Sequence, residues 1–246
     1  MNFRRYRRSD FKVVRRLYQR LLSFQMTSII YDYFYFRDGA YRSFVIEIDC
    51  KVIAHHGIIY SQQFVRGKQV LVATLSGAMV DPRASGVFMN MLKSTLNEIS
   101  ADVIVAFPNN NAEPFYRHIL KFDSIEQSYF SVDLDELNIT ADWPESGGEK
   151  VNIPIEYLRK RFDEHPQYNY QDFTLEDSTF IYKIYRGQVD ILYYSQLKKD
   201  FQYFLEHLKN EGFRKVNIIS PFGSLLKNIG FKYQSYNKFY YKNING

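Results

Sequence analysis

The segment 79–92, MVDPRASGVFMNML, has the residue types and order of a loop that binds an anion. A strand-like run ends at Val80, a proline and several small residues follow, and an apolar run with helical spacing begins at Val87. The backbone N–H groups of such a turn and the positive end of the helix dipole converge on one point. A diphosphate could approach the small residues, and Arg83 could pair with it from one side. The alternative interpretation is a tight turn that binds nothing.

The composition is that of an ordinary globular protein of 246 residues, with 46% hydrophobic and 24% charged residues. The only cysteine, Cys50, excludes an internal disulfide framework and a Cys-rich zinc site, and the five histidines are not spaced as metal ligands. We therefore expect no metal. No run approaches the roughly 18 apolar residues of a membrane-spanning helix, and the first residues lack the apolar core of a secretory signal. We expect a cytoplasmic protein with no transmembrane segment.

Positive charge is concentrated at the N-terminus, although the net charge of the chain is only +5. The cations could form the solvated face of an amphipathic helix, or a patch for phosphates or an anionic membrane surface. No nucleic-acid-binding motif accompanies them, so nucleic acid is not an expected partner. The cations are Arg4, Arg5, Arg7, Arg8, Lys12, Arg15, Arg16 and Arg20.

Hydrophobic periodicity predicts how these segments are positioned. Ser9 and Asp10 suit the start of a helix, and a meander of three strands leads directly into the loop at 79–92. Because a meander precedes the loop and no Gly-Lys-Ser/Thr follows, the motif is neither a dinucleotide fingerprint nor a P-loop. In the first half we expect helices at 10–22, 87–99 and 111–120, and strands at 43–49, 51–64, 70–80, 101–107 and 124–134.

The order of elements repeats in the second half of the chain. A helix, a buried strand, a short helix and a closing strand occur in both halves, which indicates an internal duplication. The Gly-, Pro- and acid-rich segment 138–152 separates them, and a helix is expected at 154–165. We therefore predict an α/β (α+β) fold with a mixed, mostly antiparallel central sheet flanked by helices. The predicted domains are residues 1–140 and a smaller half-domain at 150–246.

A family resemblance adds to this interpretation. The meander, the V-x-P pattern at Val80 and Pro82, and the segment PNNNAEPFYRHILKF together resemble the GNAT acyltransferases, which transfer an acyl group from coenzyme A to an amine. The resemblance implies a GNAT-like fold and acyl-CoA as co-substrate, with the loop after V-x-P around the diphosphate. It implies cofactor-binding roles for Met79, Val80, Arg83, Ser85, Gly86, Val87, Phe88, Asn109 and Asn111.

Amine acylation also needs groups that move protons. The resemblance implies that Tyr116 protonates the leaving thiolate. His55 and His56 are adjacent in a strand and must point to opposite faces, so one of them could line the acceptor cleft. We choose His56 as the general base, with water or a purely structural role for either histidine as alternatives. Ser76 could hydrogen-bond the acceptor.

The narrower resemblance is to GNAT enzymes of bacterial surface-polysaccharide synthesis, which acylate a nucleotide-linked aminosugar. It rests on the FPN segment at 107–109 and on the segment YLRKRFDEHPQYNY at 157–170. An aminoacyl-tRNA-dependent transferase of cell-wall synthesis and a non-catalytic GNAT-like binding module are the alternatives. We also expect a homodimer, because we expect aromatic residues of the second half to be exposed.

Overall fold

The structure is a computed structural model that describes residues 1–37, 39–65, 68–84, 86–137, 166, 168–195, 199–220 and 223–244. The chain divides into two compact units. Unit 1 comprises Met1–Ile125 and Phe239–Gly246, and unit 2 comprises Glu126–Lys238. The fold class is the expected one, since most strand pairs are antiparallel and helices pack on the sheets.

The sheet of unit 1 is built on the expected meander. Its strands follow the order β1-β4-β5-β6-β7-β13. Neighbouring strands are antiparallel except for β6 and β7, which run parallel. The strands are β1 (Asn2–Arg5), β4 (Ser43–Ile48), β5 (Lys51–Val65), β6 (Lys68–Val80), β7 (Val103–Ala106) and the end of β13 (Lys232–Asn243). A separate two-stranded sheet joins β2 (Phe36–Arg37) and β3 (Ala40–Tyr41).

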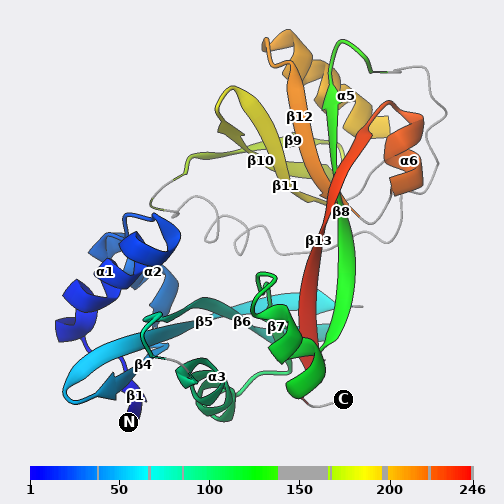
Figure 1. The fold of residues 1–246 in the computed structure, drawn as a ribbon. Helices are drawn as coiled ribbons and strands as arrows, with labels where there is room; N and C mark the ends of the chain where they lie inside the picture. The colour runs from blue at the N-terminus through cyan, green and yellow to red at the C-terminus, as the bar shows by residue number, and fades with distance from the viewer. Residues whose placement is uncertain are drawn as a thin grey trace. The chain divides into compact units, whose positions relative to one another are not determined.

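Helices cover both faces of this sheet. Figure 1 shows α1 and α2 on one face and α3 on the other. The apolar stripe of α1 is buried in the core, as its periodicity predicted. The expected helix at 111–120 contains a single π-helical turn, η2. The bounds are α1 (Phe11–Leu22), preceded by a 3-10 turn at Arg8–Asp10, then α2 (Ser28–Tyr35), α3 (Val87–Asn97) and η2 (Phe115–Ile119).

Some of the N-terminal cations form ion pairs, and others are exposed to solvent. Four of the eight form ion pairs with carboxylates of unit 1, and the Arg4 guanidinium lies 2.8 Å from both Asp10 and Glu47. Lys12, Arg15 and Arg16 lie exposed on the outer face of α1. The exposed cations of α1 form the solvated helix face that one alternative describes, whereas Arg4, Arg5 and Arg8 pair with carboxylates before that helix begins.

The helices of unit 2 pack against a single apolar core. Strands β9 to β11 form an antiparallel meander, β11 and β12 are parallel, and β12 pairs antiparallel with β8. Aromatic residues dominate the core, where Phe180 stacks on Phe204 at 4.7 Å. The elements are β8 (Asp123–Asp133), β9 (Tyr170–Leu175), β10 (Ser178–Tyr185), β11 (Gln188–Tyr194), α5 (Lys199–Asn210), β12 (Lys215–Ser220), α6 (Gly223–Asn228) and the start of β13.

The predicted repetition is present in the order and pairing of the elements. In the first half, the antiparallel pair β5–β6 is followed by α3 and by β7, which is parallel to β6. In the second half, the antiparallel pair β10–β11 is followed by α5 and by β12, which is parallel to β11. Each half therefore builds the same strand–helix–strand unit.

The predicted domain boundaries differ from this division. Residues 124–134 were expected to close the first domain, but β8 pairs with β12, with Val132 opposite Val216. The last residues of β13 instead pair with β7, with Tyr240 opposite Ala106. The two closing strands are exchanged, which a linear reading of the sequence cannot detect because both are amphipathic strands. The expected boundary at 140–150 and the expected helix at 154–165 lie outside the described residues.

Candidate active site

Strand β6 has an edge without a partner strand. Its parallel register with β7 runs from Val72 opposite Val103 to Leu75 opposite Ala106. Strand β7 ends there, whereas β6 continues to Val80. The edge of β6 beyond Leu75 therefore offers backbone N–H and C=O groups that β7 does not use. An extended ligand could bind along it as an added strand would.

A bulge interrupts β6 at the beginning of this free edge. Gly57 lies opposite Ser76, whereas His55 lies opposite Met79, so β6 contains one residue more than β5 between these pairs. Gly77 lies in the bulge with a φ of +59°. A Cβ atom at this position would lie 2.2 Å from the Tyr18 Oη. Only glycine fits both the backbone conformation and the available space.

His55 is completely buried on the face of the sheet that α1 and α2 cover. Its Nδ1 lies 3.0 Å from the Gly77 carbonyl oxygen, and its Nε2 lies 2.8 Å from the Tyr31 Oη. Burial lowers the pKa of His55 to about 4, although the bond to Gly77 acts in the opposite direction. His55 therefore does not line an open acceptor cleft, as the sequence suggested it could, but belongs to the interior.

His56 points to the opposite face, as strand alternation requires, and is also completely buried. Its Nδ1 lies 3.1 Å from the Thr95 Oγ1 on α3, and its Nε2 has no partner. Burial, and to a lesser extent His55, lowers its pKa to about 3. Because its ring is sealed and weakly basic, the structure does not support the predicted role of His56 as a general base or acceptor ligand.

Ser76 is half-buried and belongs to the same tyrosine cluster as the bulge. Its Oγ lies 3.2 Å from the Tyr35 Oη, which lies 2.8 Å from the Tyr18 Oη. The hydroxyl therefore faces protein groups on α1 and α2. A direct hydrogen bond from Ser76 to an acceptor, as predicted, would compete with the one to Tyr35.

The loop after β6 is organised by Asp81. This carboxylate accepts hydrogen bonds from the Arg83 backbone N–H at 3.1 Å and from the Arg83 guanidinium at 2.9 Å, and Arg20 approaches it to 3.0 Å. The bonds from Arg83, followed by that from Arg20, hold the pKa of the Asp81 carboxyl well below its usual range. The Arg83 side chain is 84% exposed and pairs with Asp81, so the predicted contact with an anion would compete with this ion pair and stays a prediction.

The first turn of α3 follows directly. Gly86 precedes the helix with a φ of +77°, and no atom lies within 4 Å of where its Cβ would be. The N–H groups at the start of α3 have no intrahelical acceptor, so the helix presents donors and a partial positive charge here. Ser85, which was expected to contribute, lies outside the described residues.

The remaining loop-proximal residues direct their side chains into the protein. Val87 is buried and Val80 and Phe88 are half-buried in one apolar cluster, whereas Met79 is buried in the cluster that includes residues of α1 and α2. The ring of Phe88 contacts that of Phe115 edge-on at 5.4 Å. Their predicted contact with a cofactor can therefore involve N–H and C=O groups but not most of the side-chain surface.

We expect Gly86→Glu to weaken CoA binding by at least about 10-fold, because its carboxylate would occupy the anion-binding end of α3. Gly86→Ala is the matched control, since it shares the backbone strain of about 1–2 kcal/mol without adding charge. Isothermal titration with CoA measures both affinities. Equal affinity for CoA in the two variants would remove Gly86 from the predicted site.

Tyr116 lies in η2 with only 3% of its surface exposed. Its ring contacts Phe122 edge-on at 5.4 Å. No described residue hydrogen-bonds its hydroxyl. In the described part of the chain, the only completely buried side-chain atoms without a hydrogen-bond partner are His56 Nε2 and Asn217 Oδ1. The Tyr116 hydroxyl also lacks a partner but is not one of them, so it is in contact with solvent. Burial raises the pKa of Tyr116, which keeps the hydroxyl protonated at neutral pH.

The asparagines after β7 are exposed. The Asn109 Oδ1 accepts the Ala112 N–H at 3.0 Å, and its backbone oxygen accepts the N–H of Glu113 at 2.9 Å. Asn109 thus stabilises the turn into η2 and keeps its side-chain amide N–H groups for other partners. Asn111 is exposed on the same turn, where its predicted contact with a cofactor stays a prediction.

The whole chain superimposes on known enzyme structures. A GCN5-related N-acetyltransferase from Kribbella flavida matches with a TM-score of 0.71 and 13% identity, over 98% of this chain and 71% of that one. Another, from Anabaena variabilis, matches with a TM-score of 0.71 and 17% identity, over 99% and 73%. The chain has the fold of the GCN5-related N-acetyltransferases.

A more distant match with the GNAT fold is the glucosamine N-acetyltransferase region of a fungal multi-domain GH3 β-N-acetylglucosaminidase. Its TM-score is 0.60 at 12% identity, over 98% of this chain and 38% of that one. No family model matches the sequence, and no curated protein is significantly similar to it. The likeness is therefore one of structure.

The second GNAT-like half repeats the bulge, since Ile181 lies opposite Tyr193 and Tyr182 opposite Ile191, but differs at its strand ends and at its helix. The Tyr194 Oη on β11 and the Ser220 Oγ on β12 lie 2.9 Å apart and connect the ends of these two parallel strands. Asp200, in the first turn of α5, is buried and accepts a hydrogen bond from Ser178 at 2.6 Å. A carboxylate at this helix end disfavours an anion. We therefore assign the candidate site of this GNAT fold to the first half.

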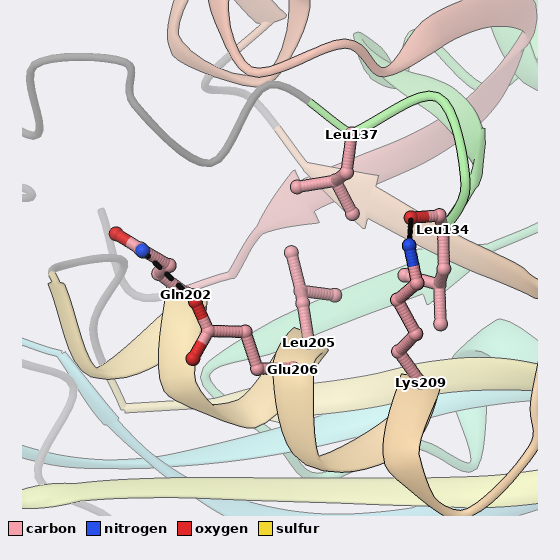
Figure 2. Close-up of a pocket in the computed structure, with 6 residues that line it drawn as sticks. All are labelled: Leu134, Leu137, Gln202, Leu205, Glu206 and Lys209. Atoms are coloured by element: carbon pink, nitrogen blue, oxygen red, sulfur yellow. Dashed lines mark hydrogen bonds between the residues drawn. The ribbon is translucent and has the colours of Figure 1, made fainter.

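A pocket in unit 2 does not change this assignment. Figure 2 shows Leu137 and Leu205 beside a small depression, with the hydrogen bonds from Gln202 to Glu206 and from Lys209 to the Leu134 carbonyl. Its volume of about 10 Å³ holds at most one water molecule. A cofactor of the size of acyl-CoA does not fit there.

Two further observations concern the described residues alone. No group of three or more His, Cys, Asp or Glu side chains in them is arranged to hold a metal ion. None of their helices has both the length and the apolar character needed to cross a bilayer.

Sequence reasoning missed the residues that shape this part of the GNAT fold. Gly77 was treated as an ordinary strand residue, although an isolated glycine inside a long strand pattern is itself a signal for a bulge. The tyrosines Tyr18, Tyr31 and Tyr35 surround His55, which no local pattern indicates. The pairing of Asp81 with Arg20 is a contact across 61 residues that no local pattern indicates.

Proposed function

We propose that this protein is a CoA-dependent N-acyltransferase of the GNAT type. The observation that carries the proposal is the course of β6. Its edge is free beyond Leu75, contains the Gly77 bulge and leads through a short loop to the N-terminus of α3. A pantetheine arm can bind a free strand edge, and a diphosphate can bind a helix N-terminus. This strand connects the two features in the order that acyl-CoA requires.

The residues present fit such a ligand at both ends. The first-turn N–H groups of α3 would bind the diphosphate, since Gly86 leaves the space before them open. A backbone N–H of the bulge would bind the thioester carbonyl and stabilise the negative charge that develops on its oxygen. Asn109 could donate its amide N–H to the pantetheine arm.

The reaction requires few protein groups. The neutral amine attacks the thioester carbon, a C–N bond forms and the C–S bond breaks. We assign to Tyr116 the donation of a proton to the departing sulfur, because its hydroxyl is protonated, unpaired within the described residues and accessible. The proton that the amine loses passes to water, since both candidate histidines are buried.

For the acceptor, we propose a small amine, and among small amines a nucleotide-linked aminosugar. The support is the resemblance of the FPN segment and the similarity in fold to a region that acetylates glucosamine. The expectations of a cytoplasmic location and of a homodimer belong to the same proposal.

The test is a turnover assay that measures free thiol release. The purified chain is given acetyl-CoA or a longer acyl-CoA, together with glucosamine or a dTDP-linked aminosugar. We expect thiol release that depends on both substrates, and thermal stabilisation by acyl-CoA alone because it binds the folded state. Stabilisation by aminoacyl-tRNA and not by any acyl-CoA would favour the tRNA-dependent alternative. Silence with every ligand would leave a non-catalytic module and overturn the proposal.

A further inference from the structure

The carbonyl group of Gly77 is held by a side chain instead of the strand ladder. The register of β5 and β6 passes from Ser76 to Met79, so Gly77 and Ala78 together lie opposite the single residue His56 and are not in regular ladder pairs. The Gly77 oxygen instead lies 3.0 Å from the His55 Nδ1. A carbonyl oxygen can only accept, so His55 carries its proton on Nδ1.

The position of this proton determines which group donates in each of the other hydrogen bonds around His55. With the proton on Nδ1, the neutral ring accepts at Nε2, and the Tyr31 hydroxyl at 2.8 Å must donate to it. The Tyr31 oxygen in turn can accept from the Ser43 hydroxyl at 2.7 Å. Every polar atom of this buried chain is satisfied, which fixes the tautomer and the orientation of the ring.

The orientation of one peptide group depends on this chain. The peptide bond between Gly77 and Ala78 is trans, so its N–H points away from its C=O. The His55 ring lies on the β5 side of Gly77 and on the face that α1 and α2 cover, so a carbonyl turned toward it directs the Ala78 N–H away from β5 and away from that face. Strand β7 leaves the side of β6 away from β5 free beyond Leu75.

We infer that His55 is a positioning residue: by holding the Gly77 carbonyl, its imidazole directs the Ala78 N–H to the free edge of β6, where the thioester oxygen binds. This inference rests on the proposed acyltransferase function. It assigns to a buried histidine the alignment of the donor that stabilises the developing oxyanion. It also gives α2 a role in the reaction, because Tyr31 on that helix orients the ring.

The surroundings of the ring restrict it to this arrangement. The rings of Tyr18, Tyr31 and Tyr35 lie 5.6 to 5.7 Å from the His55 ring, centre to centre. The Tyr18 and Tyr35 hydroxyls lie close to the Gly77 Cα, within 2.8 Å of where a Cβ would be. The bulge therefore rests on a closely packed aromatic layer and has little freedom to rotate.

Two amide substitutions separate the two bonds of His55. In His55→Asn, the side-chain N–H group takes the place of Nδ1 and can still donate to Gly77. In His55→Gln, the amide extends to the place of Nε2, so it can reach Tyr31 but not Gly77. We expect kcat to fall by about 30- to 100-fold in His55→Gln and by less than about 5-fold in His55→Asn, with KM for acyl-CoA within about 3-fold in both. A merely structural histidine would give equal losses, or losses that follow the melting temperature, and either result would overturn the inference.

A second measurement needs no variant. The ¹⁵N chemical shifts of the His55 ring in the intact protein report its tautomer, and we expect the proton on Nδ1 across neutral pH. A proton on Nε2, or an imidazolium ion at pH 7, would overturn the inference even if the variants do not fold. The proposed function fails separately, since a wild-type protein without acyl-CoA-dependent thiol release would refute it whatever the tautomer.

Discussion

Tyr116→Phe is expected to lower kcat by about 10²- to 10³-fold, because it removes the proton donor for the leaving thiolate. The affinity for acyl-CoA should change by less than about 3-fold, since the ring and its contact with Phe122 remain. The hydroxyl makes no hydrogen bond within the described residues, so its loss should leave the melting temperature almost unchanged. Steady-state kinetics with thiol detection, together with a thermal melt, measure all three quantities.

A second tyrosine serves as the control for this substitution. Tyr182 in unit 2 is also buried among aromatic rings, with Phe204 at 5.3 Å, and has no proposed role. Tyr182→Phe should retain wild-type turnover. If Tyr116→Phe also retains it while chemistry limits the rate, Tyr116 is not the acid, and water is left as the proton source.

Gly77→Ala should destabilise the protein by about 3 kcal/mol or more, which corresponds to a fall in melting temperature of roughly 10 °C. The added Cβ would overlap the Tyr18 Oη and force apart the hydroxyls of Tyr18 and Tyr35, and alanine is also strained at a φ of +59°. In molecules that still fold, the bulge is displaced, so kcat should fall by at least about 10²-fold. Thermal unfolding and kinetics on the same preparation test both effects.

Gly187→Ala isolates the backbone strain from the steric conflict. Gly187 lies in a turn of unit 2 with a φ of +74°, and no atom lies within 4 Å of its Cβ position. We expect a cost of about 1–2 kcal/mol and unchanged turnover. If Gly77→Ala costs no more stability than Gly187→Ala, the aromatic layer does not constrain the bulge, and the predicted loss of kcat loses its physical basis.

Local patterns determined most of the first half of this protein. The period-2 alternation from 43 to 80 predicted the meander, and the helical spacing from 87 predicted α3, because both depend on residues close together in the chain. The opposite directions of His55 and His56 also followed from alternation. The repeated order of elements predicted two similar halves, and the V-x-P segment indicated the GNAT fold.

Only the tertiary structure decided what those elements do. Alternation cannot reveal that helices cover both faces of β5, and this is why neither histidine is open to an acceptor. The bulge at Gly77 can be recognised only when the paired residues of β5 and β6 are known. The ion pair of Arg83 involves a carboxylate, Asp81, that also binds the distant Arg20. The exchange of β8 and β13 depends on which distant strand each one meets. These properties are non-local, because they arise from the free energy of packing segments that are far apart in the chain, and no short stretch of sequence encodes them.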